Sequence, residues 1–270
     1  MDARDFDHLI GQTIIDRYRS DSGREPVFEW VGMQWDLLDD VWPPAYSPGG
    51  ELFADLIPFA TMSSFLEMGC GTGIMSVLAA QAGCGSVLGL DINPAAVRNT
   101  RINAARHGVA ARVEARVSNL YSAVRAGERF DGIYWNPPFL DAPEDRFDRS
   151  IWHETMFDPA FAKLRGFLRD GLPLLRPAGR FYLWFGEALG NPTLIEDLGA
   201  EVGLRVRVLK RLSLSAEPEL LSGPFMADLM TALGDAVEPA EDGAEWHLHL
   251  LELRPAAAAE PDPDGAGAVR

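Results

Sequence analysis

The chain has 270 residues, 47% of them hydrophobic, which is enough to bury the core of one large domain or of a domain with a small cap. Asp and Glu number 40 against 24 Lys and Arg, so the formal net charge is −16. This charge argues against a long polyanionic partner, because nucleic-acid binding needs a basic footprint. A small molecule or a peptide is the favoured class of substrate, and nucleic acid is less favoured.

The sequence has no feature of an exported or membrane-spanning protein. The N-terminal residues MDARDFDHLI are acidic and lack the basic and apolar regions of a signal peptide. No apolar run is long enough to span a bilayer. The two cysteines, Cys70 and Cys84, match neither a disulfide framework nor a metal motif. We therefore expect a cytoplasmic protein that holds no metal ion.

Residues 1–50 are expected to form a cap or lid. Apolar side chains at helical spacing predict a helix over residues 3–20, and the aromatic-rich residues 27–42 favour short strands. A loop rich in Pro and Gly follows at 42–50. Tyr46 in this loop is a candidate for contact with the substrate.

Strands and helices alternate through residues 51–254, which predicts an α/β domain with a mostly parallel sheet and helices on both faces. Strands are expected near 63–69, 85–91, 111–117, 130–135, 179–185, 204–211 and 246–253. Helices are expected at about 50–60, 72–83, 94–107 and 159–176. In the third helix, Asn93 is the expected N-cap, Pro94 the first helical residue and Gly108 the stop. The tail at 255–270 is rich in Ala and Pro, and we expect it to be disordered.

A glycine-rich turn joins the first strand of this domain to the next helix. Residues 67–73 read Glu-Met-Gly-Cys-Gly-Thr-Gly, and the glycines permit a tight turn and close approach of a ligand to the backbone. The next strand ends in Asp91, where a carboxylate can accept hydrogen bonds from both hydroxyls of a ribose. The pattern is G-x-G-x-G and not the dinucleotide pattern G-x-G-x-x-G, so it fits a cofactor without phosphate.

The segments FLEMGCGTG and VLGLDINPAAV resemble the first two cofactor motifs of class I methyltransferases that use S-adenosylmethionine (SAM). The resemblance implies a seven-stranded Rossmann-like sheet with SAM as cofactor. On the family pattern, Glu67 and Gly69 lie near the methionine part of SAM, Asp91 holds the ribose and Ile92 packs on the adenine. Asn119 stands where the family often has an Asp that bonds the adenine amino group. The expected cofactor site consists of Glu67, Gly69, Gly71, Gly73, Asp91, Ile92 and Asn119. A purely structural glycine turn and an NAD-type site are the alternatives.

Asn136-Pro137-Pro138-Phe139 follows the fourth strand and resembles the (D/N/S)-P-P-(Y/F) motif of amino-group methyltransferases. That group includes nucleobase N-methyltransferases and enzymes that methylate the amide of a glutamine side chain. The Asn136 side-chain oxygen and the Pro137 carbonyl can accept hydrogen bonds from the target N–H groups, which directs the nitrogen lone pair toward the methyl carbon. Phe139 can stack on a planar target group. The predicted catalytic residues are Asn136, Pro137 and Phe139, and the predicted further substrate contacts are Trp152 and His153.

These motifs predict a SAM-dependent N-methyltransferase that acts on an amide, amine or heteroaromatic amine of a small molecule or peptide. One alternative is a housekeeping enzyme that methylates RNA or a protein glutamine, and another is a non-catalytic SAM-binding or scaffold protein. The chain lacks the P-R-P-x-T-E pattern of the glutamine-amide enzymes, which weakens the interpretation as a release-factor enzyme. Positive charge is locally denser at Arg98, Arg101, Arg106, Arg112 and Arg116, where a solvated helix face is expected.

Overall fold

The centre of the molecule, in the computed structural model, is a sheet of seven strands. The structure describes residues 3–20, 25–44, 49–186, 193–213 and 247–256. The strands are β3 (Ser64–Met68), β4 (Ser86–Asp91), β5 (Val113–Val117), β6 (Phe130–Trp135), β7 (Leu175–Gly186), β8 (Leu204–Ser213) and β9 (His247–Pro255). Their order is β5-β4-β3-β6-β7-β9-β8, and β9 is antiparallel to both of its neighbours whereas the strands from β5 to β7 pair in parallel. The predicted seven-stranded, mostly parallel sheet is confirmed.

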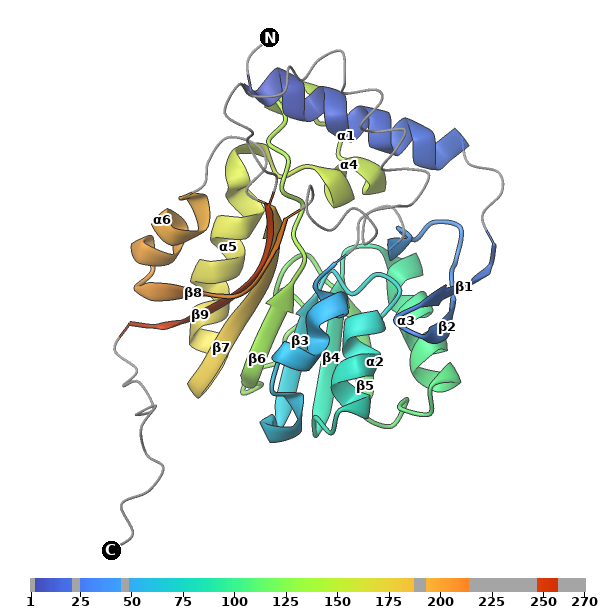
Figure 1. Cartoon of the computed structure of the whole chain (residues 1–270), viewed down its shortest axis with the longest axis vertical. Helices are drawn as coiled ribbons and strands as arrows, with labels where there is room; N and C mark the ends of the chain where they lie inside the picture. Colours follow the sequence, from blue (N-terminus) through green and yellow to red (C-terminus); the bar gives the residue numbers. More distant parts are fainter. Residues whose placement is uncertain (1–2, 21–24, 45–48, 187–192, 214–246, 257–270) are drawn as a thin grey trace, which may run out of the picture.

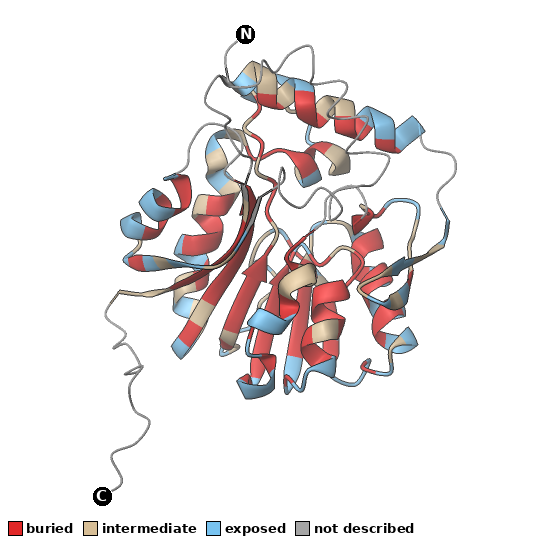
Figure 2. Cartoon of the chain, viewed as in Figure 1, coloured by how far each residue is buried: buried red, intermediate tan, exposed pale blue. Residues whose placement is uncertain are grey.

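Helices cover both faces of this sheet (Figure 1). The helices that do so are α2 (Ile74–Gln81), α3 (Pro94–Arg106), α5 (Ala162–Gly171) and α6 (Leu194–Glu201). Side chains of β7 alternate between two cores: Tyr182 and Trp184 join the core under α2, and Phe181 and Leu183 join the core under α5 and α6. Because both faces are covered, the central strands are apolar along most of their length, and Figure 2 shows them buried.

The third predicted helix has the ends that its sequence indicates. The Asn93 side chain accepts a hydrogen bond from the backbone N–H of Ala95 at 2.8 Å, and Pro94 is the first helical residue of α3. Gly108 has a φ of +70°, the left-handed conformation that commonly ends a helix. The N-cap, the first residue and the stop are all confirmed.

Two helices differ from their predictions. The helix expected at about 50–60 is instead two 3₁₀ segments, η2 (Gly50–Leu56) and η3 (Phe59–Thr61), because Pro58 has no N–H to continue a helical ladder. The helix expected at 159–176 is α5, which is shorter. Ala160 and Phe161 both have a φ of +53°, which prevents a continuous helix from Pro159 onward.

Two helices were not predicted at all. One is α6, and the other is α4 (Ile151–Met156), between the strand expected at 130–135 and the helix expected at 159–176. Ser150 is the N-cap of α4, and its hydroxyl accepts a hydrogen bond from the His153 N–H at 3.3 Å. With six residues, α4 is too short to give a clear helical period, so the sequence pattern does not reveal it.

The N-terminal 50 residues occupy two separate places. The predicted helix is α1 (Ala3–Ser20), and it lies with α4 across the carboxyl ends of the parallel strands (Figure 1). The predicted short strands are the hairpin β1 (Val27–Trp30) and β2 (Met33–Asp36), which packs beside α3. Asn99 and Asn103 of α3 donate to the Asp36 carbonyl at 2.8 and 2.9 Å. Of these two elements, α1 and not the hairpin therefore covers the edge of the sheet at which ligands of such folds bind.

The segment predicted to be a disordered tail begins with the end of β9, and residues 257–270 lie outside the described part of the chain. Within the described residues, no helix combines the length and apolar character needed to cross a membrane.

Candidate active site

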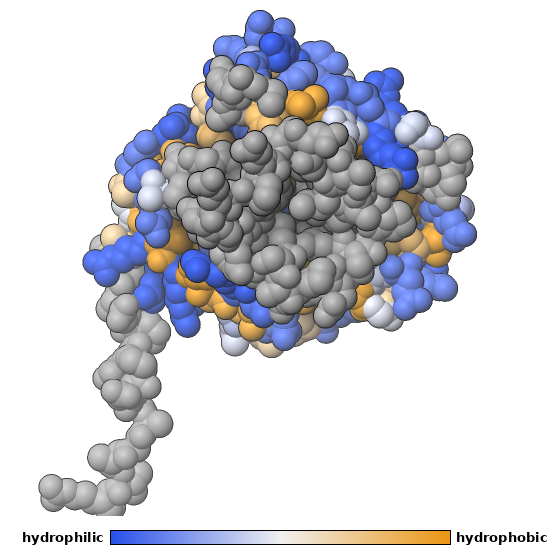
Figure 3. Space-filling model, turned by 45° about the horizontal axis from the view of Figure 1, so that its top comes forward, coloured by the Kyte–Doolittle hydropathy of each residue, from blue (hydrophilic) through white to orange (hydrophobic). Residues whose placement is uncertain are grey.

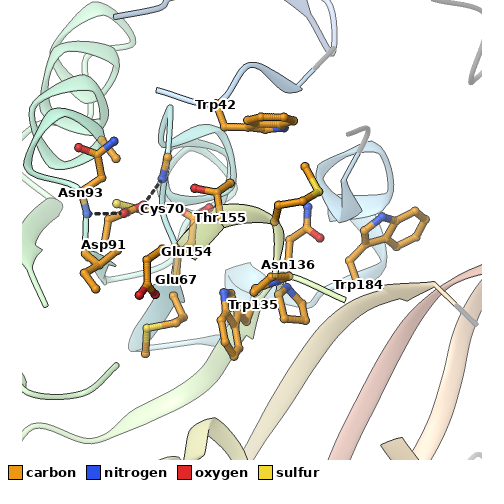
Figure 4. A pocket seen from close by; sticks show the side chains of 18 of the residues that line it. Trp42, Glu67, Cys70, Asp91, Asn93, Trp135, Asn136, Glu154, Thr155 and Trp184 are labelled. Atoms are coloured by element: carbon orange, nitrogen blue, oxygen red, sulfur yellow. Dashed lines mark hydrogen bonds between the residues drawn. The ribbon is translucent and has the colours of Figure 1, made fainter. Parts of the chain in front are cut away.

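A cavity of about 310 Å³ lies at the carboxyl ends of the parallel strands. The turns after β3, β4, β5 and β6 form its floor, and residues of α1 and α4 form its roof. In Figure 4, Asp91 and Asn93 lie on one side of the cavity, Asn136 and Trp184 lie on the opposite side, and Trp42 lies above. Open parallel sheets with helices on both faces bind their ligands at this edge.

Most residues that the sequence singled out line this one cavity. They are Glu67, Gly69, Gly71, Asp91, Ile92, Asn119, Asn136, Pro137 and Phe139. Gly73 is not in the wall, because it is the N-cap of α2, where a Cβ atom would lie 2.8 Å from the Thr100 Cα. Tyr46 lies outside the described residues. The structure thus brings Asp91 of the predicted cofactor site and Asn136 of the predicted catalytic site, about 45 positions apart in the sequence, to the same cavity.

Trp152 and His153 join α4 to α1 and do not line the cavity. The Trp152 ring lies 4.7 Å from the Tyr18 ring of α1. His153 is buried, its Nδ1 accepts a hydrogen bond from the Asp148 N–H at 3.2 Å, and its Nε2 faces the Gln12 Oε1 at 3.2 Å. Because Nδ1 accepts, the proton of a neutral His153 is on Nε2 and is donated to Gln12. The next residues of α4, and not these two, reach the cavity.

The glycine turn needs glycine for its backbone conformation. Gly69, Gly71 and Gly73 have φ values of +62°, +49° and +83°, which other residues rarely adopt. A Cβ atom at Gly69 would lie 3.0 Å from the Trp135 Nε1. The Gly71 N–H donates to the Asp91 Oδ2 at 2.9 Å, so the turn is tied to the end of β4. The turn therefore presents bare backbone to the cavity.

Glu67 occupies the position at which dinucleotide folds bind phosphate. Its buried carboxyl oxygen Oε2 accepts hydrogen bonds from the Ser76 N–H, at 2.8 Å, and from the Ser76 hydroxyl, both in the first turn of α2. A helix N-terminus is otherwise a ready anion site. Burial raises the pKa of Glu67 to about 8. Because this side chain occupies the helix N-terminus, the site fits a cofactor without phosphate and does not fit a dinucleotide.

Asp91 ends β4, and both of its carboxylate oxygens accept hydrogen bonds. The Oδ2 accepts from Gly71, and the Oδ1 accepts from the Asn93 N–H at 2.8 Å. Burial raises the pKa of Asp91 to about 6, so the group is ionised at neutral pH. A carboxylate has about four acceptor positions, so two stay available for hydroxyl groups in the cavity. Ile92, 40% exposed, adds an apolar surface beside it.

Most ionisable side chains in the wall of the cavity are acidic: Glu51, Glu67, Asp91 and Glu154. Lys163 is the single Lys or Arg among the described residues of the wall, and its Nζ lies 2.7 Å from the Glu154 Oε2. With a pKa of about 8, Glu67 is mostly protonated at neutral pH, whereas Asp91 is ionised there. The Asp91 carboxylate attracts a cationic ligand and repels phosphate. A sulfonium cofactor satisfies this requirement.

Several wall residues were missed by the sequence analysis. Glu51 follows a Gly-Gly pair at the start of the helix expected at 50–60, and Trp184 lies within an apolar strand. Ile10 and Ile14 line the cavity from α1. None of these positions has a motif, and only the path of the chain brings them to the cavity.

The proteins of similar sequence described next are named as methyltransferases, and so is a solved structure of similar fold. The family model "methyltransferase small domain" matches residues 46–198. The release factor glutamine methyltransferase of Cereibacter sphaeroides is 33% identical over 208 residues, which are 71% of this chain and 72% of that enzyme. The tRNA1(Val) (adenine(37)-N6)-methyltransferase of Shewanella loihica is 25% identical over 221 residues, 79% of this chain and 86% of that one. A structure of geranyl diphosphate methyltransferase in complex with SAM matches with a TM-score of 0.50 at 16% identity, covering 75% of this chain and 83% of that chain.

The sheet, the glycine turn and the acidic strand end define a SAM-dependent methyltransferase of class I. The chain belongs to the methyltransferase small-domain family, and SAM is its cofactor. The predicted fold, enzyme class and cofactor are confirmed, and the NAD-type and non-catalytic alternatives are set aside. The roles of individual residues, such as ribose binding by Asp91, stay predictions.

Proposed function

We propose that this enzyme transfers a methyl group from SAM to the primary amide nitrogen of a glutamine side chain in a protein or peptide. The observation that carries the proposal is that Asn136, directly after β6, lines the same cavity as Asp91. The relative from Cereibacter sphaeroides, named for methylation of release factor glutamine, supports this choice among nitrogen acceptors.

The residues at the end of β6 suit an amide acceptor. An amide nitrogen is a poor nucleophile because its lone pair is delocalised. Asn136 and Pro137 line the cavity. We expect the Asn136 side-chain oxygen and the Pro137 carbonyl to accept the two N–H groups of the amide and so to direct its lone pair toward the methyl carbon. SAM, when bound, supplies a methyl group on a positively charged sulfur that leaves as a neutral thioether.

The roof of the cavity suits a slender substrate. Ile10 and Ile14 of α1 and Met156 of α4 present apolar side chains to the cavity, which match the aliphatic stem of a glutamine. The opposite side of α1 is charged, and the upper edge of the molecule in Figure 3, where α1 lies, is mainly hydrophilic. A roof of this kind admits a side chain or a short segment and excludes bulk water from the reacting nitrogen.

The tRNA relative makes a nucleobase amine the main competitor as acceptor. Charge argues against it. Two of the five locally dense arginines are ion-paired within the chain: Arg106 lies 2.8 Å from the Asp36 carboxylate, and Arg116 lies 2.7 Å from both Glu114 and Glu128. Together with the acidic wall of the cavity, these pairs leave a weak basic footprint for RNA.

The test is a methyl-transfer assay with SAM labelled in its methyl group. Three acceptors are offered separately: a bacterial release factor, glutamine-containing peptides, and total tRNA. We expect label in the release factor or the peptides, and mass spectrometry to place it on a glutamine. The Asn136→Ala variant, with SAM binding checked by calorimetry, is the control and should transfer little label. Label in tRNA alone would overturn the proposal.

A further inference from the structure

Glu51 is a cavity residue to which neither the motifs nor the family pattern assigned a role. It lies in η2, and its Oε1 accepts hydrogen bonds from the Trp30 Nε1 at 3.1 Å and from the Gly49 N–H at 3.3 Å. The backbone N–H of Glu51 itself also donates to this carboxyl group, and Oε2 accepts from no other residue in the described part of the chain. Oε1 is therefore fixed by two other residues, and Oε2 keeps acceptor positions for a ligand.

The available oxygen faces Asn136 across the backbone of Gly49. A Cβ atom at Gly49 would lie 2.2 Å from the Glu51 Oε2 and 2.9 Å from the Asn136 Nδ2. A Cβ atom at Gly50 would lie 2.7 Å from the Tyr134 hydroxyl oxygen. The two glycines thus let η2 approach the end of β6, and the first keeps the space between the carboxylate and the amide free of side-chain atoms.

The other acids of the wall are engaged elsewhere. Both oxygens of Asp91 hold backbone N–H groups, and Glu67 is held by Ser76 at the start of α2. Glu154 is paired with Lys163. Glu51 differs from these three acids by its place beside Asn136, the predicted acceptor-orienting residue.

We propose that Glu51 is a further catalytic residue, which takes the proton that the acceptor nitrogen must lose. This inference rests on the proposed function. In the transfer, the nitrogen lone pair forms the bond to the methyl carbon, and the sulfur keeps the electron pair of the broken carbon–sulfur bond. The methylated nitrogen then carries an extra proton. That N–H bond breaks, its electron pair stays on nitrogen, and the proton passes to the Glu51 Oε2.

The surroundings of Glu51 suit a proton acceptor. Burial raises the pKa of Glu51, and the hydrogen bonds from its own backbone N–H, from Gly49 and from Trp30 hold the pKa down in part. A raised pKa makes the carboxylate a stronger base, provided that it is ionised when the reaction starts. The rate should therefore rise with pH as Glu51 ionises. Trp30→Phe removes one donor that stabilises the ionised form of Glu51, so the pKa of Glu51 should rise further. The acidic limb of the pH–rate profile, in which the rate rises as Glu51 ionises, should then move to higher pH.

The first experiment compares Glu51→Gln with wild type and with Asp55→Asn, an exposed carboxylate in the same segment. We expect Glu51→Gln to lower kcat by about 100-fold or more, a usual size for the loss of a general base. SAM affinity by calorimetry and KM for the acceptor should change little, and the acidic limb of the kcat profile should disappear. Asp55→Asn should behave as wild type, and Trp30→Phe should shift the limb to higher pH.

Two results would overturn the inference: a kcat of Glu51→Gln within about threefold of wild type, or an acidic limb that survives in Glu51→Gln and is lost in Glu67→Gln. If wild type methylates a tRNA amine and no amide, the proposed function fails, and the same variants still test Glu51 with that acceptor.

A direct readout does not depend on turnover. In protein labelled with ¹³C at the glutamate carboxyl carbon and saturated with S-adenosylhomocysteine, the Glu51 signal is the one missing from Glu51→Gln. We expect it to titrate above the usual glutamate range and to shift when N-acetylglutamine amide is added, with a smaller shift in Asn136→Ala. An unshifted signal would contradict contact between Glu51 and the acceptor, whatever the assay of turnover shows.

Discussion

Asp91 is the residue whose removal should weaken cofactor binding most. In the structure its carboxylate accepts hydrogen bonds from the backbone of Gly71 and Asn93 at 2.9 and 2.8 Å, so it holds the glycine turn against β4. Hydrogen bonds to a charged group contribute about 1.5–3 kcal/mol each. Loss of two such bonds to the ribose hydroxyls alone costs roughly 3 kcal/mol, and a loosened turn adds to it. Asp91→Ala should therefore bind SAM at least about 100-fold more weakly, since 1.4 kcal/mol is a factor of ten.

Calorimetric titration with SAM measures this effect, and Asp39→Ala, at an exposed position, is the control. The same titration has a pH dependence of known sign. Because the pKa of Asp91 is raised from 3.8 to about 6, the carboxylate is ionised above pH 6 and becomes protonated below it. Wild-type affinity should fall as the pH drops below 6. Affinity of Asp91→Ala within threefold of wild type, at a pH where the wild-type carboxylate is ionised, would refute the ribose assignment.

Three further predictions concern the roof and the turn. Burial raises the pKa of Asp7 in α1 from 3.8 to about 6, so folded-state stability is lost as the pH rises through this range. Asp7→Asn should raise Tm by several degrees at pH 8 and hardly at pH 4, and equal shifts in calorimetric melts would contradict this. A Cβ atom at Gly11 would lie 2.3 Å from the Phe157 ring, so Gly11→Ala should displace α1, which faster proteolysis within residues 3–20 would report. Gly69→Ala, at a φ of +62°, should cost about 1–2 kcal/mol of stability and weaken SAM binding; a melt and a titration like those of wild type would argue against a strained turn.

The sheet was predictable because its strands carry strong local signals. β3, β4 and β6 are short apolar runs bounded by turn residues, and α3 has a capping Asn, a Pro and a terminal Gly in the expected order. The helix ends that failed depend on features without such signals. The left-handed Ala160 and Phe161 shorten α5, and no sequence rule assigns that conformation to Ala or Phe.

The floor of the site was predictable to the extent that motifs occupy it. Residues such as Gly71, Asp91 and Asn136 each follow a strand, and the carboxyl ends of parallel strands meet at one edge. The roof was not predictable in detail. Residues 1–50 were expected to form one cap, but α1 and Trp42 line the cavity, while the hairpin is held on α3 by Asn99 and Asn103. The two Asn side chains donate hydrogen bonds to a carbonyl that lies 63 and 67 positions away in the sequence. Contacts between such distant positions produce no hydrophobic periodicity from which they could be predicted.

Glu51 illustrates why some residues of the site can be recognised only from the three-dimensional structure. In the sequence it is one acid among 40, after two glycines in a Pro-rich loop. The structure shows why the two glycines matter: because they have no side chains, η2 can approach the end of β6. The expected P-R-P-x-T-E pattern is missing here, yet a carboxylate still reaches the acceptor side of the cavity. This chain lacks that pattern but keeps an acidic group, Glu51, in the position where we propose that a proton acceptor acts.

The charge of the cavity and its roof restrict the acceptor in complementary ways. The ionised Asp91 in the wall favours a sulfonium cofactor and opposes any acceptor that brings phosphate close to it. The apolar side chains of α1 oppose a charged group that enters from above, since burying an unpaired charge is costly. A primary amide is neutral, carries two N–H donors and follows an aliphatic stem, so it satisfies both restrictions. Discrimination against RNA would then arise within the cavity itself, in addition to the net charge of −16 on the chain as a whole.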